Sequence, residues 1–393
     1  MQVQTKEFLR NKFREYYSGA SIQLPPQLEK REWGLIFFDE SYPDIVMRRH
    51  KSFANEGEIV DYIRSMVPAH AFHSSAYYFN PAAPTMKEKK WQGADLIFDL
   101  DADHLKIKWT TYGEMLRKVK DETLKLISFL TDDFGFDENC IEVVFSGGRG
   151  YHIHVRDPEI IGLGSPERRE IVDYVTGLEL EMDRIFGERT IYGDAGRMSA
   201  ETVRMSSYKD PGWGGRINRW IISFLVDLGR KKDKQAMQIL KSFEGIGGER
   251  ALEILKVARD KSNIDRIKRG NLDVSRKIPV NFWRTLVKMA IADIGVKTDE
   301  PVTADTKRLI RLPTSLHGGS GLQVMPLTLD ALNDFDPLTD AVIFGDESVG
   351  VNVIKASNVE IKGEEYKVTE GKQNLPEHLA IFLMCRGAAE YEP

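Results

Sequence analysis

The alternation of apolar and polar residues along the chain predicts both helices and strands. Residues 3–18 and 111–131 place apolar side chains three and four positions apart, which is the spacing of an amphipathic helix. Residues 95–101, 141–145 and 151–155 instead alternate with a period of two, as half-buried strands do. Strand, helix, strand, turn and strand therefore follow one another in this part of the chain, an order typical of an α+β domain.

The pattern changes after Pro158, where helical periodicity predominates for more than a hundred residues. Further helices are expected over 56–67, 165–186, 221–228, 234–243, 249–260, 281–293 and 376–385. Further strands are expected over 33–38, 70–79, 323–326, 341–344, 349–354 and 365–368. We therefore expect an α/β core formed by residues 1–160 and 286–393, with a smaller, mainly helical subdomain inserted at 161–285.

Composition restricts the class of protein without indicating an activity. The 393 residues are 41% hydrophobic and 29% charged, which is enough apolar material for a sizeable core. Cys140 and Cys385 are the only cysteines, so a disulfide framework and a cysteine-rich zinc site are excluded and a reducing compartment is indicated. Neither a membrane-spanning apolar run nor a signal-peptide core is present, and we expect a cytoplasmic protein with no membrane partner.

Two carboxylates in the strand at 95–101 are the strongest chemical signal. Asp99 and Asp101 stand two positions apart, so both side chains leave the same face of the strand. Two neighbouring negative charges are unfavourable unless a proton or a cation lies between them. Mg²⁺ and Mn²⁺ bind carboxylate oxygens, often together with a substrate phosphate, and would suit this position. A turn cap beside a solvated aspartate would explain the same two residues equally well.

A glycine-rich turn joins the strands at 141–145 and 151–155. Its sequence is Ser146-Gly147-Gly148-Arg149-Gly150. Three glycines in four positions let the backbone approach a ligand closely, and successive amides can form a concavity for an anion. The serine can donate a hydrogen bond to a phosphate, the arginine can pair with it bidentately, and His152 can reach the same group. The strand that follows argues against a P-loop, and a simple hairpin with an exposed arginine is the alternative.

A third segment combines an acid with a basic stretch. Asp299 is followed by Arg308 and Arg311, and the stretch ends at His317. The two arginines would share one face if this segment were helical. Taken alone, the aspartate is an ordinary turn residue.

The predicted helical subdomain contains two clusters of positive charge. Residues 256–277 hold eight basic residues against three aspartates, and residues 204–220 interleave four basic residues with Tyr208, Trp213 and Trp220. Cations that meet phosphates and rings that stack on bases suit a nucleic-acid strand. A solvated helix face with core tryptophans is the other interpretation, but the clusters stand out in a chain with a net charge of −5.

Three of these segments together resemble a known family. Asp-Leu-Asp at 99–101, Ser-Gly-Gly-Arg-Gly-Tyr-His at 146–152, and Asp299 with Arg-Leu-Ile-Arg-Leu-Pro-Thr-Ser-Leu-His at 308–317 have the order and spacing of the archaeal and eukaryotic replicative primase small (catalytic) subunit. The archaeal members are the most similar. The resemblance extends over most of the chain and implies a primase-type α+β core with an RRM-like part and a smaller helical subdomain.

The resemblance also implies a site and an activity. It implies a catalytic triad of Asp99, Asp101 and Asp299 that holds two Mg²⁺ or Mn²⁺ ions. With the glycines of the turn, it implies nucleotide contacts at Ser146, Gly147, Gly148, Arg149, His152, Arg311 and His317. The implied activity is template-directed synthesis of short primers on single-stranded DNA from NTPs or dNTPs during replication. The implied partner is a primase large subunit, in a heterodimer.

The chain departs from the family pattern at three points. Gly148 stands where some members have a further basic residue, and Gly319 stands where archaeal relatives have a lysine. Many relatives also hold a structural zinc between the first two motifs. Residues 102–139 contain His104 and no cysteine, so no structural zinc is expected here.

Other classes of protein could use parts of this pattern. An end-joining repair polymerase of the same superfamily would extend existing ends and would not start chains. A nucleotide-sugar glycosyltransferase would use Asp-x-Asp with one metal and would have no need of Asp299. A non-catalytic nucleic-acid-binding subunit would bind a template without metal-dependent incorporation.

Overall fold

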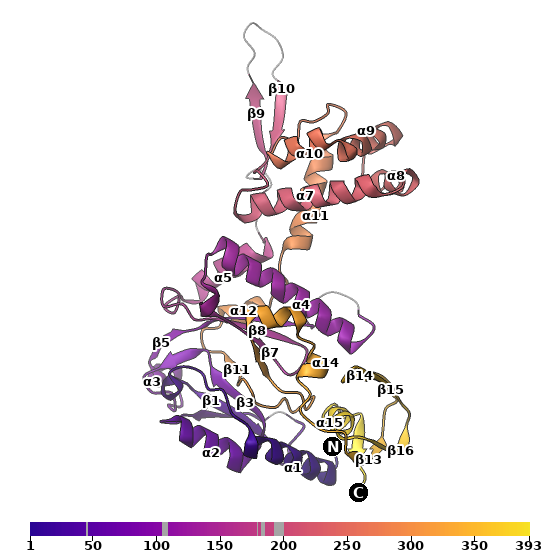
Figure 1. The fold of residues 1–393 in the computed structure, drawn as a ribbon. Coiled ribbons are helices and arrows are strands. Elements are labelled where there is room, and N and C mark those ends of the chain that lie inside the picture. The colour runs from indigo at the N-terminus through magenta and orange to yellow at the C-terminus, as the bar shows by residue number, and fades with distance from the viewer. Residues whose placement is uncertain (45, 104–108, 179, 182–184, 192–199) are drawn as a thin grey trace. The chain divides into compact units, whose positions relative to one another are not determined.

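The computed structural model describes residues 1–393 except 45, 104–108, 179, 182–184 and 192–199 (Figure 1). His104, which was considered for the zinc site, lies outside the described residues. Contacts within the chain divide it into two compact units. Unit 1 comprises Met1–Leu124, Phe136–Val172 and Lys297–Pro393, and unit 2 comprises Lys125–Gly135 and Asp173–Val296.

Unit 1 contains two four-stranded antiparallel sheets. The first has the order β11-β3-β1-β2, with β11 (Leu309–Arg311), β3 (Pro68–Ser74), β1 (Trp33–Phe37) and β2 (Arg48–Lys51). The second has the order β12-β7-β8-β6, with β12 (Met325–Leu327), β7 (Ile141–Phe145), β8 (Gly150–Val155) and β6 (Leu96–Asp101). Strands from distant parts of the sequence are therefore neighbours in both sheets.

The apolar side of β6 lies in the core, and its polar side carries the carboxylates. Leu96, Phe98 and Leu100 are fully buried, as the alternating pattern predicts. The two sheets meet where the rings of His73 on β3 and His154 on β8 lie 6.1 Å apart. The short helix α12 (Glu300–Ala304) packs against β6.

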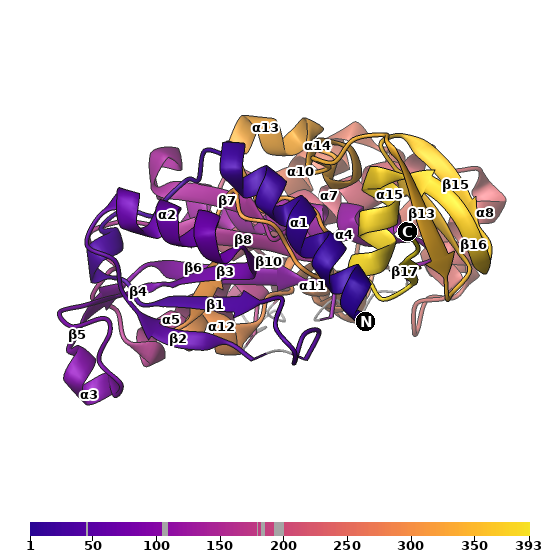
Figure 2. The ribbon, with the colours of Figure 1, turned by 90° about the horizontal axis from the view of Figure 1, so that it is seen from below.

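Helices α1 (Val3–Gly19) and α2 (Glu56–Met66) lie along the first sheet (Figure 2). α1 buries Leu9, Phe13 and Tyr17, which are four residues apart and so share one face of the helix. The Asn55 side chain accepts a hydrogen bond from the Glu58 amide and caps α2. Beside this layer, β4 (Ala76–Tyr78) pairs with β5 (Trp91–Ala94), and α3 (Met86–Lys89) lies between them in the sequence.

The C-terminal part of unit 1 forms a further layer. Its sheet has the order β16-β13-β17, with β16 (Gly371–Pro376), β13 (Ser348–Val353) and β17 (Ala389–Tyr391). The hairpin of β14 (Ser357–Ile361) and β15 (Glu364–Val368) lies in the same part of the chain, as do α13 (Leu329–Asp334) and α14 (Pro337–Asp340). Helix α15 (Glu377–Cys385) is buried along its whole length because it packs between this sheet and α1.

Unit 2 is built around one long helix. Helix α7 (Gly212–Arg230) packs against three others, α9 (Gly248–Arg259), α10 (Lys261–Lys268) and α11 (Val280–Ile294). Helix α8 (Asp233–Lys241) packs against α9, and β9 (Gly187–Ile191) pairs with β10 (Ala200–Arg204). The buried face of α7 carries Ile217, Ile221 and Leu225 at helical spacing.

Two helices contain residues of both units. They are α4 (Tyr112–Ser128), which continues into a π-helical turn at Phe129–Asp133, and α5 (Ser165–Thr176). Short 3₁₀ turns lie at Leu28–Lys30 and Glu138–Cys140. Among the described residues, no helix is both long enough and apolar enough to cross a membrane.

Several local predictions are wrong, each for an identifiable reason. Of the helix expected over 165–186, α5 ends at Thr176 because Gly177 adopts a left-handed conformation, with φ of +71°, and residues 179 and 182–184 lie outside the described residues. Residues 341–344 form no strand, although Ala341 and Phe344 are buried, since an apolar run can pack into a core without a partner strand. The segment around Arg308 and Arg311 contains strand β11 and is not helical.

Other boundaries also differ from the predicted ones. The strand expected over 70–79 is two strands, β3 and β4, and the connector at 86–92 contains helix α3. Helix α10 and the β9–β10 hairpin were not predicted, since both are short and polar. The fold class is nevertheless the expected one, a mixed α+β protein with several antiparallel sheets.

Candidate active site

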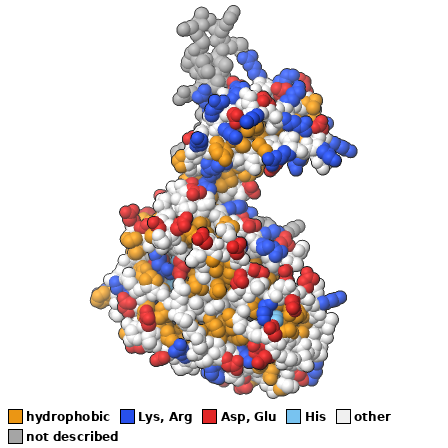
Figure 3. All heavy atoms as spheres, viewed as in Figure 1, with side chains coloured by type: hydrophobic (Ala, Val, Ile, Leu, Met, Phe, Trp, Pro, Cys, Tyr) orange, Lys and Arg blue, Asp and Glu red, His pale blue; other side chains and the backbone are white. Residues whose placement is uncertain are grey.

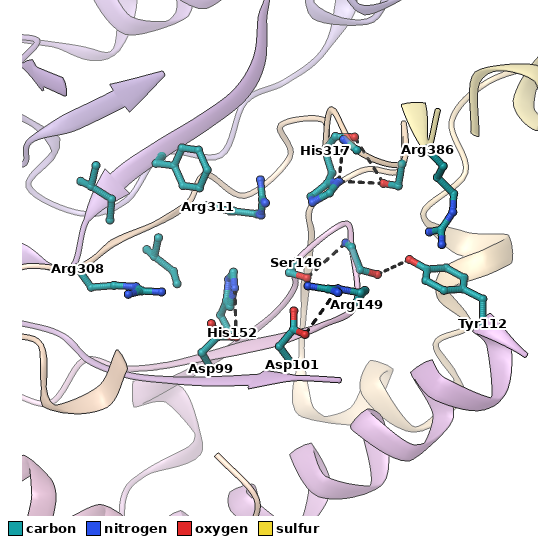
Figure 4. Close-up of a pocket in the computed structure, with 16 residues that line it drawn as sticks. Asp99, Asp101, Tyr112, Ser146, Arg149, His152, Arg308, Arg311, His317 and Arg386 are labelled. Atoms are coloured by element: carbon teal, nitrogen blue, oxygen red, sulfur yellow. Dashed lines mark hydrogen bonds and ion pairs between the residues drawn. The ribbon is translucent and has the colours of Figure 1, made fainter. Parts of the chain in front are cut away.

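A cavity of about 350 Å³ opens in unit 1 between its two four-stranded sheets (Figure 4). Both sheets contribute lining residues, as do the first residue of α4 and the residue that follows α15. Eight of the ten predicted site residues line it, namely Asp99, Asp101, Ser146, Gly148, Arg149, His152, Arg311 and His317. Asp299 and Gly147 are not among the lining residues.

The two carboxylates lie on one side of this cavity. Asp99 and Asp101 project from β6, where they pair in register with His152 and Gly150 of β8. Their side chains are 19% and 25% exposed, so both carboxylates are accessible from the cavity (Figure 4). His152 Nε2 lies 3.7 Å from Asp99 Oδ1, and Arg149 Nε lies 3.7 Å from Asp101 Oδ1.

The glycine turn is shaped by close contacts that exclude larger side chains. Gly147 has φ of +74°, and a Cβ there would lie 2.7 Å from the Cβ of His317. A Cβ at Gly150 would lie 1.9 Å from the carbonyl oxygen of Leu100. Ser146 Oγ accepts hydrogen bonds of 3.3 Å from the amides of Gly148 and Gly150, so two of the amides expected to face an anion are held by this hydroxyl.

Arg149 has an acidic partner in Asp103. Its Nη2 lies 2.6 Å from Asp103 Oδ2, and its Nη1 donates a 2.8 Å hydrogen bond to Asp103 Oδ1. This bidentate pair is half exposed, with side-chain exposures of 49% and 55%. A phosphate that binds Arg149 must therefore compete with an exposed carboxylate, which is a weak competitor in water.

His152 is neutral at pH 7 in this environment. Burial, together with the nearby cations of Arg311 and Arg308, lowers the pKa of its imidazole to about 3, although Asp101 opposes the shift. Its Nδ1 is buried and has no hydrogen-bond partner among the described residues. A neutral imidazole can donate one hydrogen bond but brings no positive charge to a phosphate.

The opposite wall of the cavity carries a second basic group. Arg311 lies on β11, where its Nη1 is 2.7 Å from His70 Nδ1 and its guanidinium lies 5.0 Å from the centre of the Phe72 ring. Burial lowers the pKa of Arg311 to about 10, against the raising effect of Asp99 and Asp101, so it remains charged at pH 7.

His317 is held beside the glycine turn in one orientation. Its Nδ1 accepts a 3.2 Å hydrogen bond from the Gly319 amide, which leaves Nε2 as the protonated nitrogen of the neutral ring. Burial and the nearby Arg311 keep the pKa of His317 well below its usual range. The ring lies edge-on to that of His70, with centroids 5.0 Å apart.

Asp299 lies next to the carboxylate strand without lining the cavity. Its amide donates a 3.2 Å hydrogen bond to the carbonyl of Asp99, and Thr298 Oγ1 donates to the same carbonyl. The third predicted carboxylate thus comes from the N-terminus of α12, immediately beside β6. Within the part of the chain that the structure describes, however, no three His, Cys, Asp or Glu side chains are grouped so that they could hold a metal ion.

Besides Ser320, three polar cavity residues were missed by the sequence analysis as site residues. Tyr112 begins α4, and its hydroxyl donates a 2.5 Å hydrogen bond to the Gly148 carbonyl. Arg386 follows α15, with its guanidinium 4.6 Å from the centre of the Tyr112 ring. Arg308 precedes β11 and lies at the other end of the cavity from Arg386 (Figure 4). Only Arg308 stands in a recognisable motif, the basic segment at 308–317. No signal in the sequence marked Tyr112 or Arg386 as a site residue.

If the cavity binds the nucleotide that the family resemblance implies, we expect Arg386→Ala to raise the KM for that nucleotide by roughly tenfold with a smaller change in kcat, because it removes a cation that lines the cavity. The check is steady-state incorporation at varied nucleotide concentration. Arg386→Lys keeps the charge and should recover part of the loss. An unchanged KM in the alanine variant would mean that Arg386 only supports Tyr112.

Two carboxylates that face a ring of arginines beside a glycine turn are typical of enzymes that act on phosphorylated substrates with divalent cations. A model of the DNA primase small subunit family matches residues 98–329. Proteins called DNA primase small subunit PriS from Methanococcoides burtonii, Methanothrix thermoacetophila and Methanocella arvoryzae are 50%, 50% and 51% identical to the chain. The alignments cover 100%, 99% and 100% of this chain and 100% of each relative.

The chain therefore belongs to the DNA primase small subunit family. It is a catalytic subunit of the archaeal type, a nucleotidyltransferase of DNA replication. The expectation of a primase is confirmed, and the glycosyltransferase and non-catalytic alternatives are set aside. The family generally uses divalent metal ions, and its small subunit implies a large-subunit partner and a DNA template.

Proposed function

We propose that this chain starts new strands on single-stranded DNA by joining NTPs or dNTPs into short primers. In this reaction a 3′-hydroxyl attacks the α-phosphorus of the next nucleotide, a new P–O bond forms, and the bond to the β-phosphate breaks to release pyrophosphate. The observation that carries the proposal is the cavity itself. Asp99 and Asp101 lie on one side of it, and Arg311 and His317 lie across from them beside the glycine turn.

Asp99 and Asp101 fit the role of metal ligands. They are hard oxygen donors on one face of a strand, and both are accessible from the cavity. We propose that they hold two Mg²⁺ or Mn²⁺ ions, and that Asp299 completes the ligand set from its position beside Asp99. Such ions would activate the attacking hydroxyl and offset the charge on the phosphates.

The remaining cavity residues suit the triphosphate. Arg149 and Arg311 are charged donors on opposite sides of the cavity, and both can bind phosphate oxygens through more than one N–H group. His152 and His317 act as neutral donors, with the Nε2 proton of His317 directed by the hydrogen bond at its Nδ1. Ser146 shapes the turn, and Gly147 and Gly148 allow His317 to approach it.

We further propose the finer architecture that the family resemblance implies. Residues 1–160 and 286–393 would form the primase-type core, including its RRM-like part, and residues 161–285 would form the inserted helical subdomain. The antiparallel sheet β12-β7-β8-β6 of unit 1 and the bundle of α7–α11 in unit 2 support this assignment. The proposed partner is a primase large subunit, in a heterodimer.

Synthesis on an unprimed single strand tests the proposal. The full chain, alone and with a primase large subunit, should incorporate labelled nucleotides into short products with Mg²⁺ or Mn²⁺, and a metal chelator should abolish incorporation. A primed template run in parallel distinguishes a polymerase that only extends ends. Extension of the primer with no synthesis on the unprimed strand, even with the large subunit present, would contradict the proposal.

A further inference from the structure

Unit 2 carries a concentration of positive charge that the proposed active site does not use. Residues 204–288 contain 20 Lys and Arg against 9 Asp and Glu, a net charge of +11, in a chain whose net charge is −5. Figure 3 shows Lys and Arg side chains gathered over the exposed surface of this unit. A segment this basic within an acidic protein is the electrostatic pattern of a nucleic-acid contact.

Part of this charge forms a defined patch between two segments that pair with each other. The Met205 amide donates to the Gly270 carbonyl at 2.9 Å, and the Tyr208 amide donates to the Lys268 carbonyl at 2.8 Å. Arg204 forms an isolated bridge with Asn271. The pairing gathers six residues from three segments, which we call the basic patch: Arg204, Tyr208, Lys209, Arg219, Lys268 and Arg269.

The basic patch presents an aromatic ring among its cations. Tyr208 is 40% exposed. Arg219 reaches it from α7: its Nη1 donates a 2.8 Å hydrogen bond to the Tyr208 carbonyl, and its guanidinium lies 6.0 Å from the ring centre. An exposed ring held beside a guanidinium is suited to stack on a base while cations contact the phosphates.

Few carboxylates neutralise the basic patch. Lys268 pairs with Asp265 at 3.6 Å, an exposed contact within one helix that contributes little. Asp210 is exposed and accepts a hydrogen bond from the Ser207 amide. Within the described ranges, no carboxylate lies within ion-pair distance of Lys209 or Arg269. Both side chains are exposed and available to an anion.

We propose that the basic patch binds single-stranded DNA, and that unit 2 thereby holds part of the template outside the catalytic cavity. The inference rests on the proposed function, since a primase needs a template strand. The combination of cations with an exposed ring favours a single strand over an acidic protein segment, because unpaired bases present faces that can stack. None of the residues of unit 2 that the structure describes lines the cavity, so this contact is separate from nucleotide binding.

The test is binding of a fluorescently labelled oligo(dT) to the full chain at several salt concentrations. We expect Lys209→Ala combined with Arg269→Ala to weaken binding about tenfold and to lower the slope of log Kd against log[salt] by roughly 1.4, since each lost phosphate contact removes about 0.7. Tyr208→Ala should weaken binding roughly five- to a hundredfold with the slope unchanged, and Tyr208→Phe should bind nearly as the parent does.

Matched controls keep the result specific to the basic patch. Lys231→Ala combined with Lys232→Ala removes the same charge from exposed positions just beyond the C-terminal end of α7, which lies roughly 17 Å along the helix from Arg219, and should change binding far less. Equal loss in this control would overturn the localised site. Unchanged oligo(dT) binding in the patch variants, with weakened association of a primase large subunit, would identify a protein contact and also overturn it. Nucleotide incorporation by the parent chain is measured in parallel. If the parent chain incorporates nucleotides, either outcome counts against the basic patch alone and not against the proposed function.

Discussion

Replacement of Asp101 by asparagine is expected to abolish nucleotide incorporation while the fold stays intact. The side chain is 25% exposed, lies at the end of β6 and faces the cavity, so the amide fits the same space. It lacks the negative charge that holds a divalent cation, and we expect kcat to fall by at least about 10³-fold. Incorporation rates at saturating Mg²⁺ and Mn²⁺ measure the effect.

The control for this variant is Asp61→Asn on the exposed face of α2, which removes the same charge far from the cavity and should leave incorporation unchanged. Thermal unfolding of both variants reports on the fold. Normal synthesis by the Asp101 variant at added Mg²⁺ or Mn²⁺ would exclude the carboxylate from metal binding, and the proposed two-metal site would fall with it.

Replacement of Asp95 by alanine is expected to have the largest effect on stability. The carboxylate is fully buried, 3.0 Å from Arg31 Nη2 and 3.2 Å from Arg156 Nε, and it accepts a hydrogen bond from the Tyr77 hydroxyl. Arg31 is also fully buried. Removal of the carboxylate leaves a buried guanidinium without its counter-charge, which typically lowers the free energy of unfolding by about 3–5 kcal/mol.

Urea unfolding of the full chain measures this loss. Arg48→Ala, which breaks the exposed Arg48–Asp39 pair, is the comparison and should lower the free energy of unfolding by only about 0–1 kcal/mol. A loss below about 1 kcal/mol for the Asp95 variant would show that Arg31 finds other partners, such as the Ser74 and Ser75 carbonyls to which it already donates. Because its carboxylate is fully buried in ion pairs, Asp95 has a structural role, whereas Asp99 four residues later lines the cavity.

Much of the candidate site could be located from the sequence because its parts are local. The spacing of Asp99 and Asp101 places both on one strand face whatever surrounds the strand. The glycines at 147 and 150 mark a turn whose close contacts admit no Cβ, as the structure shows. Periodicity also located most of the helices and core strands, since burial of one face imposes a repeat on the sequence itself.

The rest of the site depends on contacts between distant segments, which leave no local pattern. Tyr112 and Arg386 are 274 positions apart in the sequence, yet their side chains contact each other at the same cavity wall. The apolar run at 341–344 was mistaken for a strand because the existence of a partner strand is a property of the fold. The charge state of His152 also depends on packing, because burial among arginines keeps the imidazole neutral.

The sequence by itself determined the α+β class, the paired carboxylates, the glycine turn and the basic clusters of residues 204–288, because each depends on residues close together in the chain. Only the tertiary structure decided which residues share the cavity and that Arg149 pairs with Asp103. It also decided that a segment from each of the two basic clusters meets the other around Tyr208. The physical reason is that side-chain spacing along a strand or helix is set by backbone geometry, whereas burial, charge state and long-range contact are set by packing.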